Sequence, residues 1–150
     1  MVAAHIIGNL YLGDMQDAIA MGRQGLHCIC VLEEEPMAEP DDSTCIWILR
    51  KEGGMVRADE GQLDVVADTI ESRLASGQSV LVHCGAGVER GPLAVAWYLH
   101  RKVGMTMDEA YQHVMGRRPQ AQRRDIDLPE KHYADWLHRW SKVGEAWTGI

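Results

Sequence analysis

The amino-acid sequence predicts an α/β fold with a central, mostly parallel sheet flanked by helices. Short apolar runs alternate along the chain with longer segments of helical periodicity, an order typical of parallel sheets. The length of 150 residues suits one domain, which we expect to span residues 1–150. A content of 46% hydrophobic and 25% charged residues is ordinary for a globular protein and excludes a disordered or collagen-like chain.

The first half of the chain predicts three strands and one short helix. The expected strands are His5–Leu12, His27–Leu32 and Thr44–Leu49. The second and third are rich in Ile, Val, Cys and Trp, as buried strands are. Asp14 is placed to cap a short helix that runs to about Arg23. Residues 33–42 are acidic and contain two prolines, which predicts a solvated loop.

The second half of the chain predicts one more strand and four helices. Apolar residues recur at helical spacing from Leu63 to Leu74, and Gly77 follows as a C-terminal cap. Ser79–His83 is short and apolar, which predicts a buried strand. The later helices are expected at Leu93–Val103, from Met107 after a capping box of Thr106 and Glu109, and from Pro129 onward. The methionines expected in the core are Met105, Met107 and Met115.

Charge and hydropathy limit the expected partners and location. Fifteen Lys and Arg against 22 Asp and Glu give a net charge of −7, which disfavours nucleic acid and anionic membranes as partners. The amino terminus lacks a signal-peptide pattern, and the longest apolar run, Pro92–Leu99, is too short to cross a bilayer. We therefore expect a cytoplasmic monomer whose four cysteines are reduced.

A glycine-containing loop joins the fourth expected strand to the helix that follows. Cys84 stands at the end of the strand, Gly85 and Gly87 let the chain curl, and the helix begins directly after Arg90. Backbone N–H groups of such a loop and the helix amino terminus attract an anion, and an arginine can fork two phosphate oxygens. The candidate phosphate-binding residues are Gly85, Ala86, Gly87, Val88, Glu89 and Arg90.

The same arrangement favours Cys84 as a nucleophile. Thiols at helix amino termini ionise more readily than a free cysteine does. A Cys84 thiolate could attack phosphorus in line and form a cysteinyl phosphate that water later hydrolyses, while Arg90 and the loop N–H groups stabilise the equatorial oxygens. A buried cysteine is more often a small apolar residue, but here the glycines, the arginine and the helix start favour catalysis.

The order of His83, Cys84, five further residues and Arg90 after a strand resembles the signature of the cysteine-dependent protein tyrosine phosphatase superfamily. The chain is similar to its small dual-specificity branch from His5 to Leu137. The flanking segments that carry the similarity are 9–14, 75–84, 107–110 and 118–119. The resemblance implies the fold of that superfamily, with Cys84 as nucleophile and Arg90 as phosphate ligand. It also implies phosphorylated protein or peptide substrates and hydrolysis without a metal or cofactor.

Two departures from the family pattern bear directly on catalysis. Members usually carry Ser or Thr after the arginine, where the hydroxyl helps the thiolate leave, and this chain has Gly91. The family's general acid is an aspartate on a mobile loop after a strand, and Glu52 takes that position, just before a Gly-Gly pair where a hinge could lie. Asp59 is the alternative, although it also suits a helix cap, and Glu89 is a third candidate.

For His83 and for the remaining cysteines, a structural role is the simpler interpretation. Consecutive strand residues face opposite sides, so His83 is expected to be a buried structural residue that orients the loop. Cys28 and Cys30 lack the spacing of a zinc site, so no metal is expected. A second cysteine could capture an oxidised Cys84 as a disulfide, but the sequence does not identify it.

The only basic cluster of the sequence follows the helix expected from Met107. Its members are Arg117, Arg118, Arg123 and Arg124. Such clusters are mostly solvated surface, and the alternative is a secondary role in attracting phosphorylated substrate.

The sequence thus predicts a protein phosphatase that hydrolyses phosphotyrosine, with phosphoserine and phosphothreonine as further options. The expected catalytic residues are Cys84, Arg90 and Glu52. Gly91 and the missing aspartate motivate a second hypothesis, a pseudophosphatase that binds phosphorylated partners with little turnover. Arsenate reduction or sulfur transfer is disfavoured because no cysteine pair lies next to Cys84.

Overall fold

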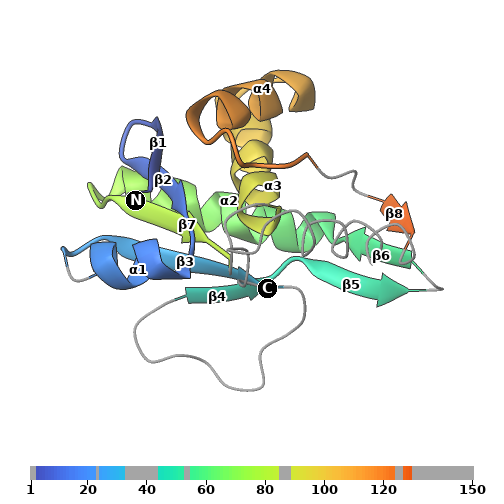
Figure 1. Cartoon of the computed structure of the whole chain (residues 1–150), viewed down its shortest axis with the longest axis horizontal. Helices are drawn as coiled ribbons and strands as arrows, with labels where there is room; N and C mark the ends of the chain where they lie inside the picture. The colour runs from blue at the N-terminus through green and yellow to red at the C-terminus, as the bar shows by residue number, and fades with distance from the viewer. Residues whose placement is uncertain are drawn as a thin grey trace.

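The computed structural model describes residues 3–22, 24–32, 44–52, 55–84, 89–123 and 127–129. In this part of the chain the expected α/β architecture is confirmed, with a five-stranded, mostly parallel sheet between helices (Figure 1). The acidic loop expected at residues 33–42 lies outside the described residues. No helix in the described ranges is long and apolar enough to cross a membrane.

The central sheet has the strand order β1-β2-β7-β3-β4. Its strands are β1 (Ala4–Ile7), β2 (Leu10–Gly13), β3 (His27–Leu32), β4 (Thr44–Trp47) and β7 (Val80–His83). All neighbouring pairs are parallel except β1 and β2. The single strand expected at His5–Leu12 is therefore a hairpin, in which Gly8 has a φ of 54°. Glycine adopts this left-handed conformation without steric cost, so the chain can reverse there.

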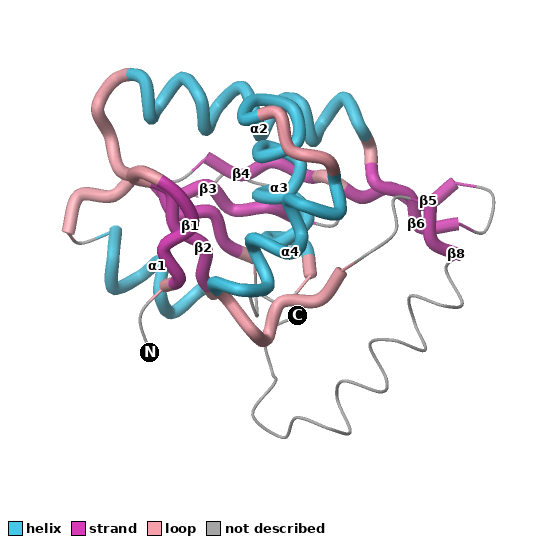
Figure 2. The backbone as a smooth tube through the Cα atoms, turned by 90° about the horizontal axis from the view of Figure 1, so that it is seen from above, coloured by secondary structure: helices cyan, strands magenta, loops and turns pink. Residues whose placement is uncertain are grey.

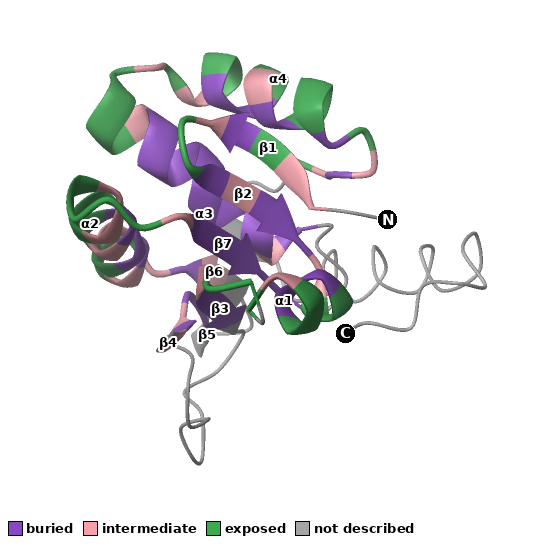
Figure 3. Cartoon of the chain, turned by 90° about the vertical axis from the view of Figure 1, so that its left-hand side faces the viewer, coloured by how far each residue is buried: buried purple, intermediate pink, exposed green. Residues whose placement is uncertain are grey.

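Helices cover both faces of the central sheet (Figure 3). One face carries α2 (Glu60–Ala75), α3 (Arg90–Tyr98) and α4 (Met107–Arg117), and the other carries α1 (Met15–Gly22). The π-helical turn η1 (Leu99–Val103) continues α3, so the helix expected at Leu93–Val103 is confirmed but starts earlier.

Side-chain caps at the starts of α1 and α4 were expected from the sequence, and the structure confirms them. Thr106 Oγ1 accepts the N–H of Glu109 at 3.1 Å, and Glu109 Oε1 accepts the N–H of Thr106 at 3.0 Å. Asp14 and Asp17 cap α1 in the same reciprocal way, at 2.8 and 3.0 Å. Such caps satisfy N–H groups that a helix leaves without partners at its start.

One expected core residue is on the surface. The buried stripe of α4 is formed by Ala110, Tyr111 and Val114. Met115 follows Val114 by one residue, which turns its side chain about 100° away from that stripe. It is 39% exposed, so its expected place in the core is wrong, whereas Met105 and Met107 pack against the core.

A second, three-stranded antiparallel sheet projects from one end of the molecule (Figures 1 and 2). It consists of β5 (Leu49–Glu52), β6 (Met55–Ala58) and β8 (Asp127–Pro129), in that order. The strand expected at Thr44–Leu49 breaks at Ile48, whose carbonyl accepts the N–H of Asp59 at 2.8 Å. The β5–β6 hairpin is therefore inserted between β4 and α2. Pro129 ends β8 instead of opening a helix, and the rest of the expected last helix lies outside the described residues.

Candidate active site

Strand β7 delivers Cys84 to the centre of the sheet. β7 lies between β2 and β3, and its Val82 is in register with Leu12 on one side and Ile29 on the other. All four residues of β7 are buried, and Cys84 directly after it is 2% exposed. The predicted buried strand before Cys84 is therefore confirmed.

Helix α3 begins beside the Cys84 sulfur. The N–H of Gly91, in the first turn of α3, donates a hydrogen bond to Cys84 Sγ at 3.3 Å. First-turn N–H groups of a helix lack partners within the helix and carry its positive partial charge, so the Cys84 sulfur lies at the positive end of α3. The candidate phosphate-binding residues Gly85, Ala86, Gly87 and Val88 lie outside the described residues, so their role stays a prediction.

The two remaining residues of the candidate loop are described. Glu89 precedes α3, is 7% exposed and forms no side-chain cap on the helix. Arg90 is the first residue of α3 and is partly exposed. Its positive charge acts on Cys30, where it opposes the factors that raise the pKa of that thiol. The charge of Arg90 therefore acts on the side of the candidate site that β3 forms.

Gly91 and Leu12 form a close contact that the sequence did not reveal. A Cβ atom on residue 91 would lie 2.8 Å from Leu12 Cδ1 and 3.6 Å from Cys84 Sγ. Leu12 is fully buried. The strand pattern predicts that Leu12 is buried. It does not predict that Leu12 lies next to the start of α3.

His83 is a buried neighbour of Cys84. Burial lowers the pKa of His83, an effect partly opposed by its hydrogen bond to the Cys84 backbone and by the charge of Asp14. Within the described chain its Nδ1 has no hydrogen-bond partner. The expected burial of His83 is confirmed, whereas its role in orienting the loop stays a prediction.

The cysteine next to His83 in the sheet is Cys30, which is in register with His83 on one side and Cys45 on the other. Burial, followed by the charge and hydrogen bond of Cys45, raises the pKa of Cys30 to about 12. A thiol that stays protonated is a weak nucleophile. The raised pKa of Cys30 therefore disfavours it as the cysteine that would capture an oxidised Cys84.

The candidate general acids occupy different settings. Glu52 is the last residue of β5 and pairs with Met55 of β6, so its backbone lies in a hairpin strand and not in the expected loop. The reason is that β6 pairs with both β5 and β8. Asp59 is the N-cap of α2 and accepts the N–H of Gln62 at 2.9 Å, and its other oxygen lies 3.7 Å from Arg50 Nε. The expected capping role of Asp59 is therefore confirmed.

The arginines that follow α4 do not form one patch. Arg118 is buried, at 3% exposure, whereas Arg117 is exposed. Arg123 forms an ion pair with Asp108 and lies over the Tyr111 ring, with 5.2 Å from its Cζ to the ring centroid. Arg124 is outside the described residues. Among the described arginines of this cluster, Arg118 is therefore buried and Arg123 is held by other side chains.

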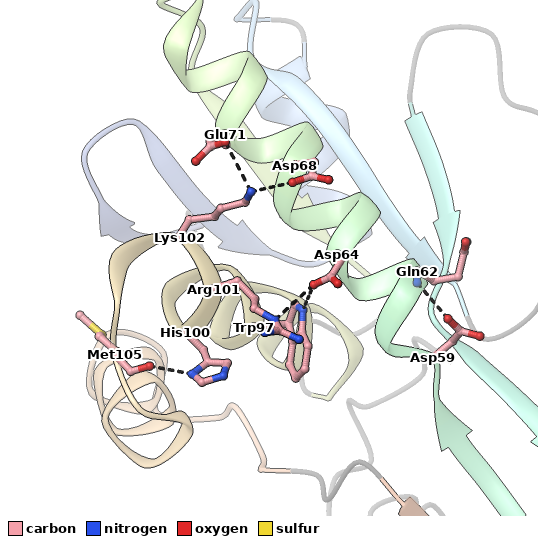
Figure 4. A network of polar contacts seen from close by, with 10 residues as sticks. All are labelled: Asp59, Gln62, Asp64, Asp68, Glu71, Trp97, His100, Arg101, Lys102 and Met105. Atoms are coloured by element: carbon pink, nitrogen blue, oxygen red, sulfur yellow. Dashed lines mark hydrogen bonds and ion pairs between the residues drawn. The ribbon is translucent and has the colours of Figure 1, made fainter.

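A polar contact holds the far end of α3 against α2 (Figure 4). Trp97 Nε1 donates to Asp64 Oδ1 at 2.7 Å, and Arg101 Nε lies 3.4 Å from the same oxygen. The Arg101 guanidinium also stacks over the Trp97 ring, 4.8 Å from its centroid. Lys102 Nζ completes the set, 2.6 Å from Asp68 Oδ1 and 3.5 Å from Glu71 Oε1. We call these six residues the α2–α3 polar contact.

In the described ranges, no three His, Cys, Asp or Glu side chains converge in a way that could hold a metal ion. The described residues supply the site with a buried thiol, a helix amino terminus and an arginine.

Comparisons with known proteins agree with this arrangement. Residues 10–143 match the family model described as "Dual specificity phosphatase, catalytic domain". Dual specificity protein phosphatase 1 of Arabidopsis thaliana is 34% identical over 118 residues, which cover 75% of this chain and 58% of that protein. This chain therefore spans somewhat more than half the length of that curated relative.

Two solved structures share the fold. A leucine-rich repeat and phosphatase domain containing protein from Entamoeba histolytica superimposes with a TM-score of 0.67 at 16% identity, covering 95% of both chains. The human tyrosine phosphatase-like serine/threonine/tyrosine-interacting protein gives a TM-score of 0.64 at 16% identity, over 93% of this chain and 98% of that one. At such low identity these matches show the fold alone.

Proposed function

Because the chain belongs to the dual specificity phosphatase catalytic domain family, we propose that it is a cysteine-dependent protein phosphatase that hydrolyses phosphotyrosine, phosphoserine and phosphothreonine. The observation that carries this proposal is the hydrogen bond from Gly91 N–H to Cys84 Sγ. A helix start that donates to a buried sulfur favours a thiolate there, and the thiolate is the nucleophilic form of cysteine.

In the first step, the Cys84 thiolate attacks the phosphorus atom of the substrate, and a P–S bond forms as the P–O bond to the substrate breaks. Arg90 and the N–H groups of residues 85–90 stabilise the equatorial oxygens of the transferring group. The leaving oxygen takes a proton from Glu52, our proposed general acid, since Asp59 already serves as a helix cap.

In the second step, the oxygen of a water molecule attacks phosphorus. The Glu52 carboxylate accepts a proton from this water, the P–S bond breaks, and its electron pair returns to the sulfur as a thiolate. Phosphate leaves, and the enzyme is restored to its starting state. The Gly91 N–H donates to the sulfur that receives this negative charge.

A specific observation favours a second candidate, a phosphate-binding pseudophosphatase. Gly91 supplies no hydroxyl beside the sulfur, so the second step lacks a side-chain donor at that position. Such a protein would bind phosphorylated partners with little turnover.

We further propose that the protein acts as a single-domain monomer in the cytoplasm on single phosphorylated side chains. The net charge of −7 and the four free cysteines support this proposal. Size-exclusion chromatography with light scattering tests the monomer directly.

The experiment that tests the proposed function mixes the protein rapidly with p-nitrophenyl phosphate in the presence of a metal chelator. We expect a burst of close to one nitrophenolate per protein, followed by steady turnover, and no burst with Cys84→Ser. Burst and turnover by pure Cys84→Ser protein would overturn the mechanism. Phosphopeptide binding by the natural protein without a burst would favour the pseudophosphatase.

A further inference from the structure

Cys30 and Cys45 lie side by side in the central sheet, and the proposed mechanism uses neither of them. β3 and β4 are parallel, and Cys30 is in register with Cys45. In-register residues of neighbouring strands point their side chains to the same face of a sheet. The two thiols also share a hydrogen bond, which is one of the causes of the raised pKa of Cys30. Both cysteines are free, so two thiols stand next to each other here.

The spacing of the two strands suits a disulfide between these residues. Neighbouring strands lie about 4.8 Å apart, and a disulfide joins residues whose Cα atoms are about 4.4–6.8 Å apart. The pair can therefore close by rotation of its side chains, with little movement of the backbone. Cys28 lies two residues before Cys30 on the same face of the sheet but is in register with Leu81. Its thiol donates to the Ala18 carbonyl at 3.7 Å, so its hydrogen-bond partner there is a helix carbonyl.

One thiol of the pair is accessible from solvent. β4 is at the edge of the central sheet, and Cys45 is partly exposed, whereas Cys30 is 5% exposed. Helix α1 packs against β2, β3 and β7 and covers the part of this face around Cys28. A small oxidant therefore meets the Cys45 sulfur first. Cys84 is placed differently, because its sulfur accepts the N–H of Gly91 in α3, which covers the opposite face from α1.

We propose that Cys30 and Cys45 form an oxidation site, which reacts with a peroxide and becomes a disulfide without participation of Cys84. In the first step, Cys45 gives up its thiol proton and its sulfur attacks one oxygen of hydrogen peroxide. An S–O bond forms, the O–O bond breaks, and the second oxygen leaves as water with that proton, so that Cys45 becomes a sulfenic acid.

In the second step, the Cys30 sulfur attacks the Cys45 sulfur. An S–S bond forms, the S–O bond breaks, and the departing hydroxide takes the Cys30 proton and leaves as water. Two thiols lose two electrons in total, and one peroxide is reduced to two waters. The raised pKa of Cys30 slows this step, since only the thiolate attacks. The position of Cys30 offsets this effect, because groups held side by side react as if they were highly concentrated.

Oxidation of the full chain carrying Cys84→Ser tests the pair without interference from the nucleophile. We expect hydrogen peroxide to consume two of its three thiols, as counted with a thiol reagent after unfolding, and dithiothreitol to restore both. Digestion after glutamate cuts at residues 33–35 and so separates Cys30 from Cys45. Mass spectrometry should then find the two peptides joined in the oxidised protein, with fragmentation placing the bond at Cys30.

Two further variants provide a matched pair, because Cys28 and Cys30 share one strand and one face. Cys28→Ser/Cys84→Ser should still form the joined peptides, whereas Cys30→Ser/Cys84→Ser should not. In the latter variant the Cys45 sulfenic acid has no thiol beside it, so dimedone should label Cys45.

Three outcomes would overturn the proposal: survival of all three thiols under peroxide, a bond from Cys45 to Cys28, and equal dimedone labelling of Cys45 with and without Cys30. The mapped bond decides the question even if Cys30→Ser does not fold, because that measurement leaves the pair unchanged. None of these measurements uses phosphatase activity, so absence of a burst in the natural protein would refute the proposed function alone.

Discussion

The two ends of α3 and its η1 extension are built in opposite ways. At the amino-terminal end, one backbone hydrogen bond of 3.3 Å joins Gly91 to a sulfur that is almost fully buried. At the other end, charged side chains on half-exposed surfaces make overlapping contacts, as Lys102 does with two carboxylates. The first end depends on a single geometry, whereas the second distributes its contacts over several side chains.

Because of this difference, we expect one end of the helix to matter for activity and the other end to matter for stability. Loss of one hydrogen-bond donor at a buried site is costly, because water does not reach the site to replace the lost donor. Exposed ion pairs are individually weak and replaceable. We therefore expect changes near Gly91 to alter turnover, and changes in the α2–α3 polar contact to alter stability slightly.

The largest contrast should come from the arginines at the two ends. Arg90→Ala should reduce kcat/KM about 10³-fold, since it removes the charge and the paired donors from the phosphate. Arg90→Lys should restore little, because an ammonium cannot fork two oxygens. Arg101→Ala is the matched control at the other end and should retain activity within about twofold. Steady-state kinetics measures all three, and a comparable loss in Arg101→Ala would remove the distinction between the two ends.

A smaller effect on activity is expected from Glu52→Gln. The rate on phenyl phosphate, a poor leaving group, should fall about 10²-fold, while p-nitrophenyl phosphate should be affected much less. An acid must be protonated to act, so the natural rate falls as pH rises, and this decline should flatten in the variant. Asp59→Asn is the control because asparagine also caps helices well. A greater loss in Asp59→Asn than in Glu52→Gln would move the acid role to Asp59.

Protonation of His83 should make the stability of the folded protein depend on pH. Burial lowers the pKa of His83 below its ordinary value of 6.5, so the unfolded chain binds this proton more readily than the folded one. Stability should therefore be lost as pH falls below 6.5, with a slope of at most about 1.4 kcal/mol per pH unit for one proton. Urea unfolding at pH 7.5 and 5.5 should show a smaller difference in His83→Gln than in the natural protein. An equal difference in both proteins would contradict this role.

The smallest effect is expected at the α2–α3 polar contact. Asp64→Ala removes the acceptor of Trp97 Nε1, whereas Asp68→Ala removes an exposed ion pair from the same helix with the same change in residue type. The two variants should differ in unfolding free energy by about 1 kcal/mol, with Asp64→Ala the less stable. Urea unfolding measures this difference, and burst kinetics should be unchanged in both. Equal stability would mean that the Trp97 bond contributes no more than a surface ion pair.

Much of the fold could be predicted because its signals are local. The caps at Thr106 and Asp14 and the apolar spacing of α2 each fix an element through residues a few positions apart. The exceptions arise where the local sequence pattern does not tell which strands pair with each other. The run at His5–Leu12 reads as one strand, yet it folds back at Gly8, and the β5–β6 hairpin becomes part of a sheet only through β8.

The sequence by itself determined the strand, the cysteine at its end and the helix start near Cys84, since these follow from residues close together in the chain. Only the tertiary structure decided that Leu12 closes the space beside Gly91 and that Cys30 lies between His83 and Cys45. Both contacts depend on strand order and register, which bring distant segments together. A local pattern predicts that Leu12 and Cys30 are buried, but the packing of the whole sheet sets which atoms they meet.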